Sequence, residues 1–142
     1  MDVTVSHQQP DDVVLVTIQG DVDVYTAPGL REHLDRLIAG GHRHLVLDLE
    51  HVPFMDSTGL GVLVGRLKRT RLQKGSMRVV CTVPRILRVF EITGLNQVLS
   101  VYDDAEEAIA QAQEHAGKDV ADAVPRNGST GGDGTGVASS AS

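Results

Sequence analysis

The segment from Phe54 to Leu63 (FMDSTGLGVL) places an acid, Asp56, and two hydroxyls, Ser57 and Thr58, between two apolar stretches. Hydroxyls beside an acid and several glycines are compatible with four roles. They could cap a helix, supply a nucleophile, cradle a bound phosphate, or accept a phosphate as a covalent modification. The spacing of the surrounding residues separates these alternatives.

Two of the four roles do not fit the spacing. A phosphate-binding loop requires GxxxxGK[ST], and a dinucleotide-binding turn requires GxGxxG, where this chain has Val64 in place of the third glycine. A nucleophile elbow requires glycine two residues before the serine, and that residue is Met55. None of the six histidines matches the position of a base for Ser57. We therefore expect no catalysis and no cofactor.

The sequence also argues against a metal site. His42, His44 and His51 are close in sequence, but no acid or thiol completes a ligand set at a recognised spacing. Cys81 is the only cysteine, so a disulfide framework and a thiolate cluster are both excluded.

The composition indicates a small globular protein. With 142 residues, of which 41% are hydrophobic, the chain is expected to form one domain with a sizeable core. The net charge of −6 argues against nucleic acid or an anionic membrane as the main partner. The sequence shows neither a signal-peptide pattern nor an apolar run long enough to cross a bilayer. We expect a cytoplasmic protein that is monomeric when free.

The elements that position this segment follow from hydrophobic periodicity. Strands are predicted at residues 3–6, 13–18, 44–49, 77–83 and 98–102. Helices are predicted after Thr26, which is a candidate N-cap, after Asp56, from Pro84, and from Asp103. This pattern predicts an α/β fold in which a small mixed sheet of four to five strands is flanked by about four helices. We assign residues 1–116 to the domain and 117–142, rich in Gly, Ser and Thr, to a flexible tail.

A helix cap and a modified hydroxyl remain possible for the opening segment. Asp56 or Ser57 would cap the helix, but a cap does not explain Gly59, Gly61 and Gly65, each costing about 0.5–1 kcal/mol relative to Ala. We expect these glycines to offer a bare surface to a partner. A phosphate on Ser57 would lie at the positive end of the helix dipole, so the fold would tolerate it while an acidic or apolar partner would not.

Three motifs in order connect the chain to a known family. DSTGLGVL at 56–63, GDVDVYTAP at 20–28 and RVFEITGL at 88–95 resemble anti-sigma factor antagonists of the STAS-domain family. The resemblance is closest to the stand-alone bacterial members and covers roughly residues 3 to 114. It implies the STAS fold and a regulatory protein rather than an enzyme.

The resemblance also implies a mechanism. The dephosphorylated antagonist would bind an anti-sigma factor that is also a serine kinase with a histidine-kinase-like ATPase fold, and so release a sigma factor. The kinase would then phosphorylate Ser57, and a PP2C-type phosphatase would restore the hydroxyl. Thr58 stands where many relatives carry a second serine and is a minor alternative acceptor.

The expected partner-binding residues surround this serine, whereas Phe54 and Met55 are expected in the core. The partner-binding set is Asp23, Tyr25, Thr26, Asp56, Ser57, Thr58, Gly59, Gly61, Val62 and Gly65. One alternative function is a STAS interaction module in a stress-signalling scaffold or transport complex. A second, a small nucleotide-binding or hydrolytic enzyme, rests only on the glycines and hydroxyls.

Overall fold

The computed structural model describes residues 1–9 and 12–123. Within these ranges the chain forms a five-stranded sheet, four α-helices and one short 3₁₀ helix. In chain order they are β1 (Asp2–Gln8), β2 (Val13–Gln19), α1 (Ala27–Ala39), β3 (His44–His51), α2 (Ser57–Leu72), β4 (Ser76–Val80), α3 (Pro84–Thr93), η1 (Leu95–Gln97), β5 (Ser100–Tyr102) and α4 (Ala105–Ala123).

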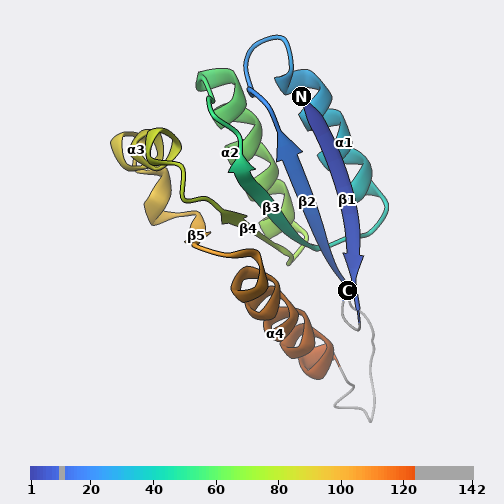
Figure 1. The fold of residues 1–142 in the computed structure, drawn as a ribbon. Helices are drawn as coiled ribbons and strands as arrows, with labels where there is room; N and C mark the ends of the chain where they lie inside the picture. The colour runs from blue at the N-terminus through green and yellow to red at the C-terminus, as the bar shows by residue number, and fades with distance from the viewer. Residues whose placement is uncertain (10–11, 124–142) are drawn as a thin grey trace.

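The strands follow each other across the sheet in the order β1-β2-β3-β4-β5. β1 is antiparallel to β2, whereas β2, β3, β4 and β5 are parallel neighbours. The carboxyl ends of β2, β3 and β4 therefore meet at one edge, and each is followed there by the start of a helix. Helices α1 and α2 lie behind the sheet and α4 lies in front of its lower part (Figure 1).

Alternating side chains of the strands build a separate apolar cluster on each face. Behind the sheet, Val14, Val16, Leu45 and Leu47 join the buried faces of α1, α2 and α3. In front, Val13, Val46 and Val80 pack against three alanines of α4, Ala108, Ala112 and Ala116. Because β3 is covered on both faces, its sequence reads as a continuous apolar run rather than an alternation.

The predicted elements are all present, with shifted boundaries. β4 ends at Val80 rather than at residue 83, because Cys81 to Val83 turn toward α3. The strand predicted from residue 98 begins at Ser100, since η1 occupies the preceding residues. α4 begins at Ala105 and continues to Ala123, so the boundary proposed between 116 and 117 falls inside a helix. The rest of the predicted tail, 124–142, lies outside the described residues.

Candidate functional site

The loops after β2 and β3 are held together at the carboxyl edge of the sheet. Val22 and Met55 form an isolated parallel bridge between them. The Val22 N–H donates to the Phe54 carbonyl at 2.9 Å, and the Asp56 N–H donates to the Val22 carbonyl at 3.1 Å. These bonds place the loop before α1 beside the first turn of α2.

The Asp56 carboxylate strengthens this connection. Its Oδ1 accepts hydrogen bonds from the N–H groups of Thr58 at 2.9 Å and Gly59 at 3.0 Å, so of the two predicted candidates, Asp56 and Ser57, the N-cap of α2 is Asp56. Its Oδ2 accepts a third bond from the Val24 N–H at 3.0 Å. One side chain thus caps a helix and fixes a loop that lies 32 residues earlier in the chain.

The loop before α1 is ordered by its own side chains. Asp23 Oδ1 accepts bonds from the N–H groups of Tyr25 at 2.9 Å and Thr26 at 3.1 Å. The Thr26 hydroxyl accepts from the Asp23 N–H at 2.9 Å and donates to the Asp21 carbonyl at 2.9 Å. Thr26 is the N-cap residue of α1, as predicted, but its side chain makes no cap hydrogen bond to that helix.

These bonds also affect the acidity of Asp23. Partial desolvation acts to raise the pKa of Asp23, but the bonds donated by Thr26 and Tyr25 together outweigh it and hold that pKa below its ordinary value. Asp23 therefore carries its negative charge beside the start of α2 and remains partly exposed.

Ser57 is the first residue of α2 and is exposed. Among the residues that the structure describes, none forms a hydrogen bond with its hydroxyl, although Asp56 is its immediate neighbour. The two nearby carboxylates, Asp56 and Asp23, accept hydrogen bonds from backbone N–H groups, and neither forms a hydrogen bond with the Ser57 hydroxyl. The hydroxyl is thus exposed, and no carboxylate or histidine of the described residues is hydrogen-bonded to it. Thr58 follows it and is also exposed.

The three glycines of α2 have different surroundings. Gly59 is buried, and a Cβ on it would lie 2.8 Å from both Met55 Cγ and Val22 Cγ1. Around Gly61 and Gly65, in contrast, a Cβ would meet nothing within 4 Å. Val62 is 8% exposed and belongs to the core. Gly59 and Val62 therefore lie beneath the surface of α2. At Gly61 and Gly65, in contrast, the lack of a side chain leaves the backbone of α2 uncovered along that surface.

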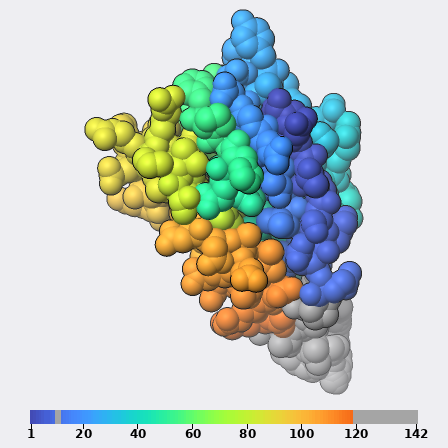
Figure 2. All heavy atoms as spheres, in the orientation of Figure 1, coloured from blue at the N-terminus to red at the C-terminus, as the bar shows by residue number. Residues whose placement is uncertain are grey.

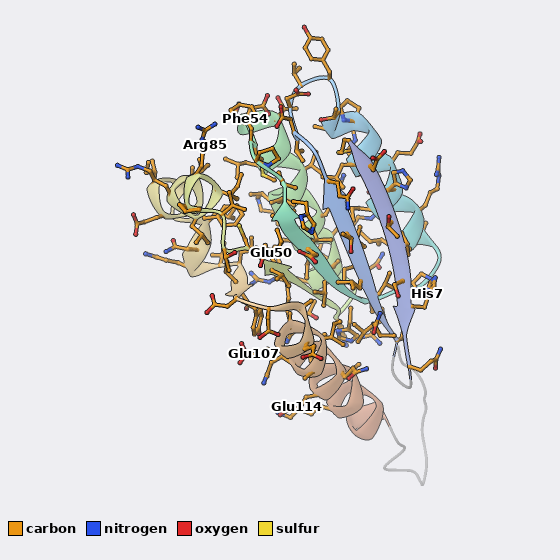
Figure 3. All side chains as sticks on the ribbon, in the orientation of Figure 1. His7, Glu50, Phe54, Arg85, Glu107 and Glu114 are labelled. Atoms are coloured by element: carbon orange, nitrogen blue, oxygen red, sulfur yellow. The ribbon has the colours of Figure 1, made fainter. Side chains whose placement is uncertain are left out.

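Apolar side chains are exposed around this edge, and two of them were not expected there. Tyr25, Val24 and Phe54 are 89%, 56% and 39% exposed. Met55, which pairs with Val22, is buried as predicted, but the prediction that Phe54 lies in the core is wrong, because that residue is 39% exposed. The loop carrying Val24 and Tyr25 forms the upper tip of the molecule (Figure 2), and Phe54 lies at the same end (Figure 3).

The described residues offer neither a metal site nor a membrane-spanning helix. In residues 1–9 and 12–123, no group of three or more His, Cys, Asp or Glu side chains is arranged to hold a metal ion. Over the same ranges, no helix combines the length and the apolar character needed to cross a membrane.

Comparison with known proteins agrees with this geometry. Residues 4–108 match the family model of the STAS domain. The chain is 40% identical to the anti-sigma-B factor antagonist of Bacillus subtilis (strain 168) over 106 residues, which cover 75% of this chain and 96% of that protein. It is 37% identical to the anti-sigma-B factor antagonist of Staphylococcus aureus, over 75% of this chain and 98% of the relative.

A solved structure extends the likeness to three dimensions. The crystal structure of an anti-sigma factor antagonist from Mycobacterium paratuberculosis superposes with a TM-score of 0.69 at 27% identity, covering 78% of this chain and 94% of the other. With the family model matching most of the described residues and relatives of this identity spanning nearly their full length, the chain belongs to the STAS-domain family.

Proposed function

We propose that this chain is an anti-sigma factor antagonist that acts by binding and is switched off by phosphorylation of Ser57. In its dephosphorylated form it binds an anti-sigma factor that is also a serine kinase, and this binding frees a sigma factor. The observation that carries the proposal is the exposed, unbonded Ser57 hydroxyl at the start of α2. Relatives that cover most of the chain carry the name of antagonist, which supports the same role.

The contact surface in this proposal is the carboxyl edge of the sheet. Tyr25 and Val24 from one loop and Phe54 from the other supply exposed apolar area around Ser57. Gly61 continues the surface along α2 and lets a partner approach the helix backbone closely. Hydrogen bonds to Asp23 and Asp56 hold the two loops in position, and Gly59 and Val62 pack beneath the loops.

Phosphorylation would use chemistry supplied by the partner. The Ser57 oxygen forms a bond to the γ-phosphorus of ATP as the bond to the ADP oxygen breaks. The hydroxyl proton passes to a base of the kinase, since no acid or histidine among the described residues is hydrogen-bonded to the Ser57 hydroxyl. A PP2C-type phosphatase reverses the modification by hydrolysis and releases inorganic phosphate. This chain itself acts as a substrate and a binding protein, not as an enzyme.

The proposed switch depends on charge rather than on unfolding. A phosphate on Ser57 lies where the first-turn amides and the helix dipole favour an anion, so the domain keeps its fold. A like charge on the partner about 4 Å away costs about 4 kcal/mol at an effective dielectric of 20, close to a thousandfold in affinity. The complex is therefore lost while the fold is retained.

The test compares three forms of the protein against the anti-sigma factor kinase of the same cell. We expect wild type and Ser57→Ala to bind with similar Kd in calorimetry without ATP, and Ser57→Asp to bind far more weakly. With Mg-ATP, wild type should gain one phosphate by intact mass and dissociate, whereas Ser57→Ala should remain bound. Thr58→Ala serves as the control and should still be modified.

Two results would contradict the proposal. Equal binding of Ser57→Ala and Ser57→Asp would show that charge at this position does not control the complex. Co-purification with transporter subunits, without phosphate on the protein in any growth state, would favour the scaffold or transport role instead.

A further inference from the structure

Helix α3 has one buried face and one uncovered face. Ile86 and Phe90 are fully buried against the core behind the sheet. On the other side, Leu87 and Ile92 are 36% and 73% exposed. The helix projects from the left side of the molecule (Figure 2), so its uncovered face is open to a partner.

The uncovered face also carries two arginines that the protein does not use internally. Arg85 and Arg88 are exposed, and neither forms a hydrogen bond or an ion pair with any residue in the described part of the chain. The only acid on the helix is Glu91.

Several other arginines have structural partners, although Arg31 on α1 is exposed and, like Arg85 and Arg88, has none among the described residues. Arg66 and Arg69 lie 3.3 and 3.2 Å from Asp35 Oδ1, and they connect α2 to α1. Arg71 donates to the Val98 carbonyl at 2.6 Å. In a chain of net charge −6, Arg85 and Arg88 form a local basic patch, because they lie within one turn of α3 and have no ion-pair partner among the described residues.

The basic patch begins at the same edge of the sheet as Ser57. α3 follows β4, whose carboxyl end lies beside that of β3 in the parallel register. Glu50, near the end of β3, accepts bonds from the N–H of Thr82 at 2.7 Å and from its hydroxyl at 2.8 Å, which ties the segment before α3 to β3. Arg85 and Phe54 lie at the same end of the molecule (Figure 3).

We propose that the outer face of α3, formed by Arg85, Leu87, Arg88 and Ile92, is a second contact surface for the anti-sigma factor. This inference rests on the proposed function. The chemistry of the face selects a partner area that carries carboxylates around an apolar patch, since unpaired guanidinium groups steer toward negative charge and exposed aliphatic side chains gain by being covered. The contact is continuous with the edge that carries Ser57, so one partner covers both.

The experiment measures Kd and association rate for the anti-sigma factor kinase without ATP, using the full chain. Arg85→Glu with Arg88→Glu should weaken binding about tenfold to a hundredfold, mainly through slower association, and the loss should shrink as salt is raised. Arg36→Glu with Lys118→Glu is the matched control. It makes the same change of net charge at side chains that are 67% and 72% exposed on α1 and α4, and it should bind like wild type.

A second pair of variants tests the apolar part of the face. Ile92→Gln should weaken binding several-fold, whereas Leu72→Gln, at an 85% exposed position at the opposite end of α2 from Ser57, should not. Circular dichroism and thermal unfolding of each variant confirm that the fold is intact. Should the double glutamate variant unfold, Arg85→Gln with Arg88→Gln gives the same comparison without reversed charge.

The outcomes separate this inference from the proposed function. If wild type binds, Ser57→Asp binds weakly and the α3 variants bind like wild type, the α3 contact is wrong and the function stands. If the control pair weakens binding as much as the arginine pair, only net charge matters and the α3 contact is again wrong. If wild type itself does not bind the kinase, the proposed function fails and this inference fails with it.

Discussion

Asp56 Oδ2 accepts a hydrogen bond from the backbone N–H of Val24 at 3.0 Å, while Oδ1 caps α2. A single carboxylate therefore fixes the distance between the loop that carries Tyr25 and the helix that begins with Ser57. The loop and the helix start, which together form the proposed contact surface, are thus held in a fixed relative position. A substitution at Asp56 should therefore disturb both of them.

Substitutions at Asp56 distinguish its cap bond to α2 from its bond to the Val24 N–H. Asp56→Asn keeps one carbonyl oxygen for the cap, because Asn is as good an N-cap as Asp, but its amide group cannot accept a bond from the Val24 N–H. We expect a smaller loss for Asp56→Asn than for Asp56→Ala, which should lower the free energy of unfolding by about 1–2 kcal/mol. Urea unfolding measures the loss. Hydrogen exchange should show faster exchange of the Val24 amide in both variants.

Replacing the glycines of α2 by alanine should give effects of opposite sign. Gly59→Ala would put a Cβ 2.8 Å from Met55 and Val22, so overpacking should cost about 1–3 kcal/mol. Gly61→Ala meets nothing within 4 Å and should stabilise the helix by about 0.5–1 kcal/mol. Chemical unfolding of both variants checks the sign. A loss of stability in Gly61→Ala would show that this position is less open than the structure indicates.

Gly75 should tolerate no side chain. A Cβ there would lie 1.9 Å from the Arg43 carbonyl oxygen, so backbone would have to move in Gly75→Ala, at a cost of about 3 kcal/mol or more. The neighbouring Lys74 has φ of 61°, and Lys74→Gly should instead stabilise the protein by up to about 1 kcal/mol. Thermal unfolding of the two variants gives the comparison, and equal midpoints would contradict it.

The hydrogen bonds that Asp23 accepts from the N–H groups of Tyr25 and Thr26 should make a pH-dependent contribution to the free energy of unfolding. Because the pKa of Asp23 is lower in the folded chain than its ordinary value of 3.8, the contribution is complete above that value and is lost as pH falls through the lower folded pKa. The difference in free energy of unfolding between wild type and Asp23→Asn should be largest at neutral pH and shrink in acid. Urea titrations across the acid range measure it. A difference that grows in acid would contradict the assignment.

Much of the local structure was predictable from the sequence. The β-branched run of β2, the apolar spacing of α1 and the N-cap role of Asp56 depend on neighbours within a few residues, where periodicity and capping preferences act. Element ends were less predictable, because Val80 ends β4 where its pairing with β5 stops and not where the β-forming residues stop.

Within the candidate site, the exposure of individual residues was the least predictable property. Phe54 and Val62 are both apolar, yet Phe54 is 39% exposed and Val62 is buried. Gly59 and Gly61 are identical in type, yet only Gly59 is pressed against Met55. Nothing in the residue types separates the members of either pair.

The sequence by itself determined that a helix begins at this segment with Asp56 or Ser57 as its cap, because capping requires only a polar side chain within reach of the next amides. The structure assigns the cap to Asp56. The tertiary structure decided what surrounds that serine. The Val22–Met55 bridge and the Asp56–Val24 bond join segments about 32 residues apart, and they arise only when β2 and β3 pair in parallel. The position of Arg85 near the same edge depends on the same parallel register, which no local pattern encodes.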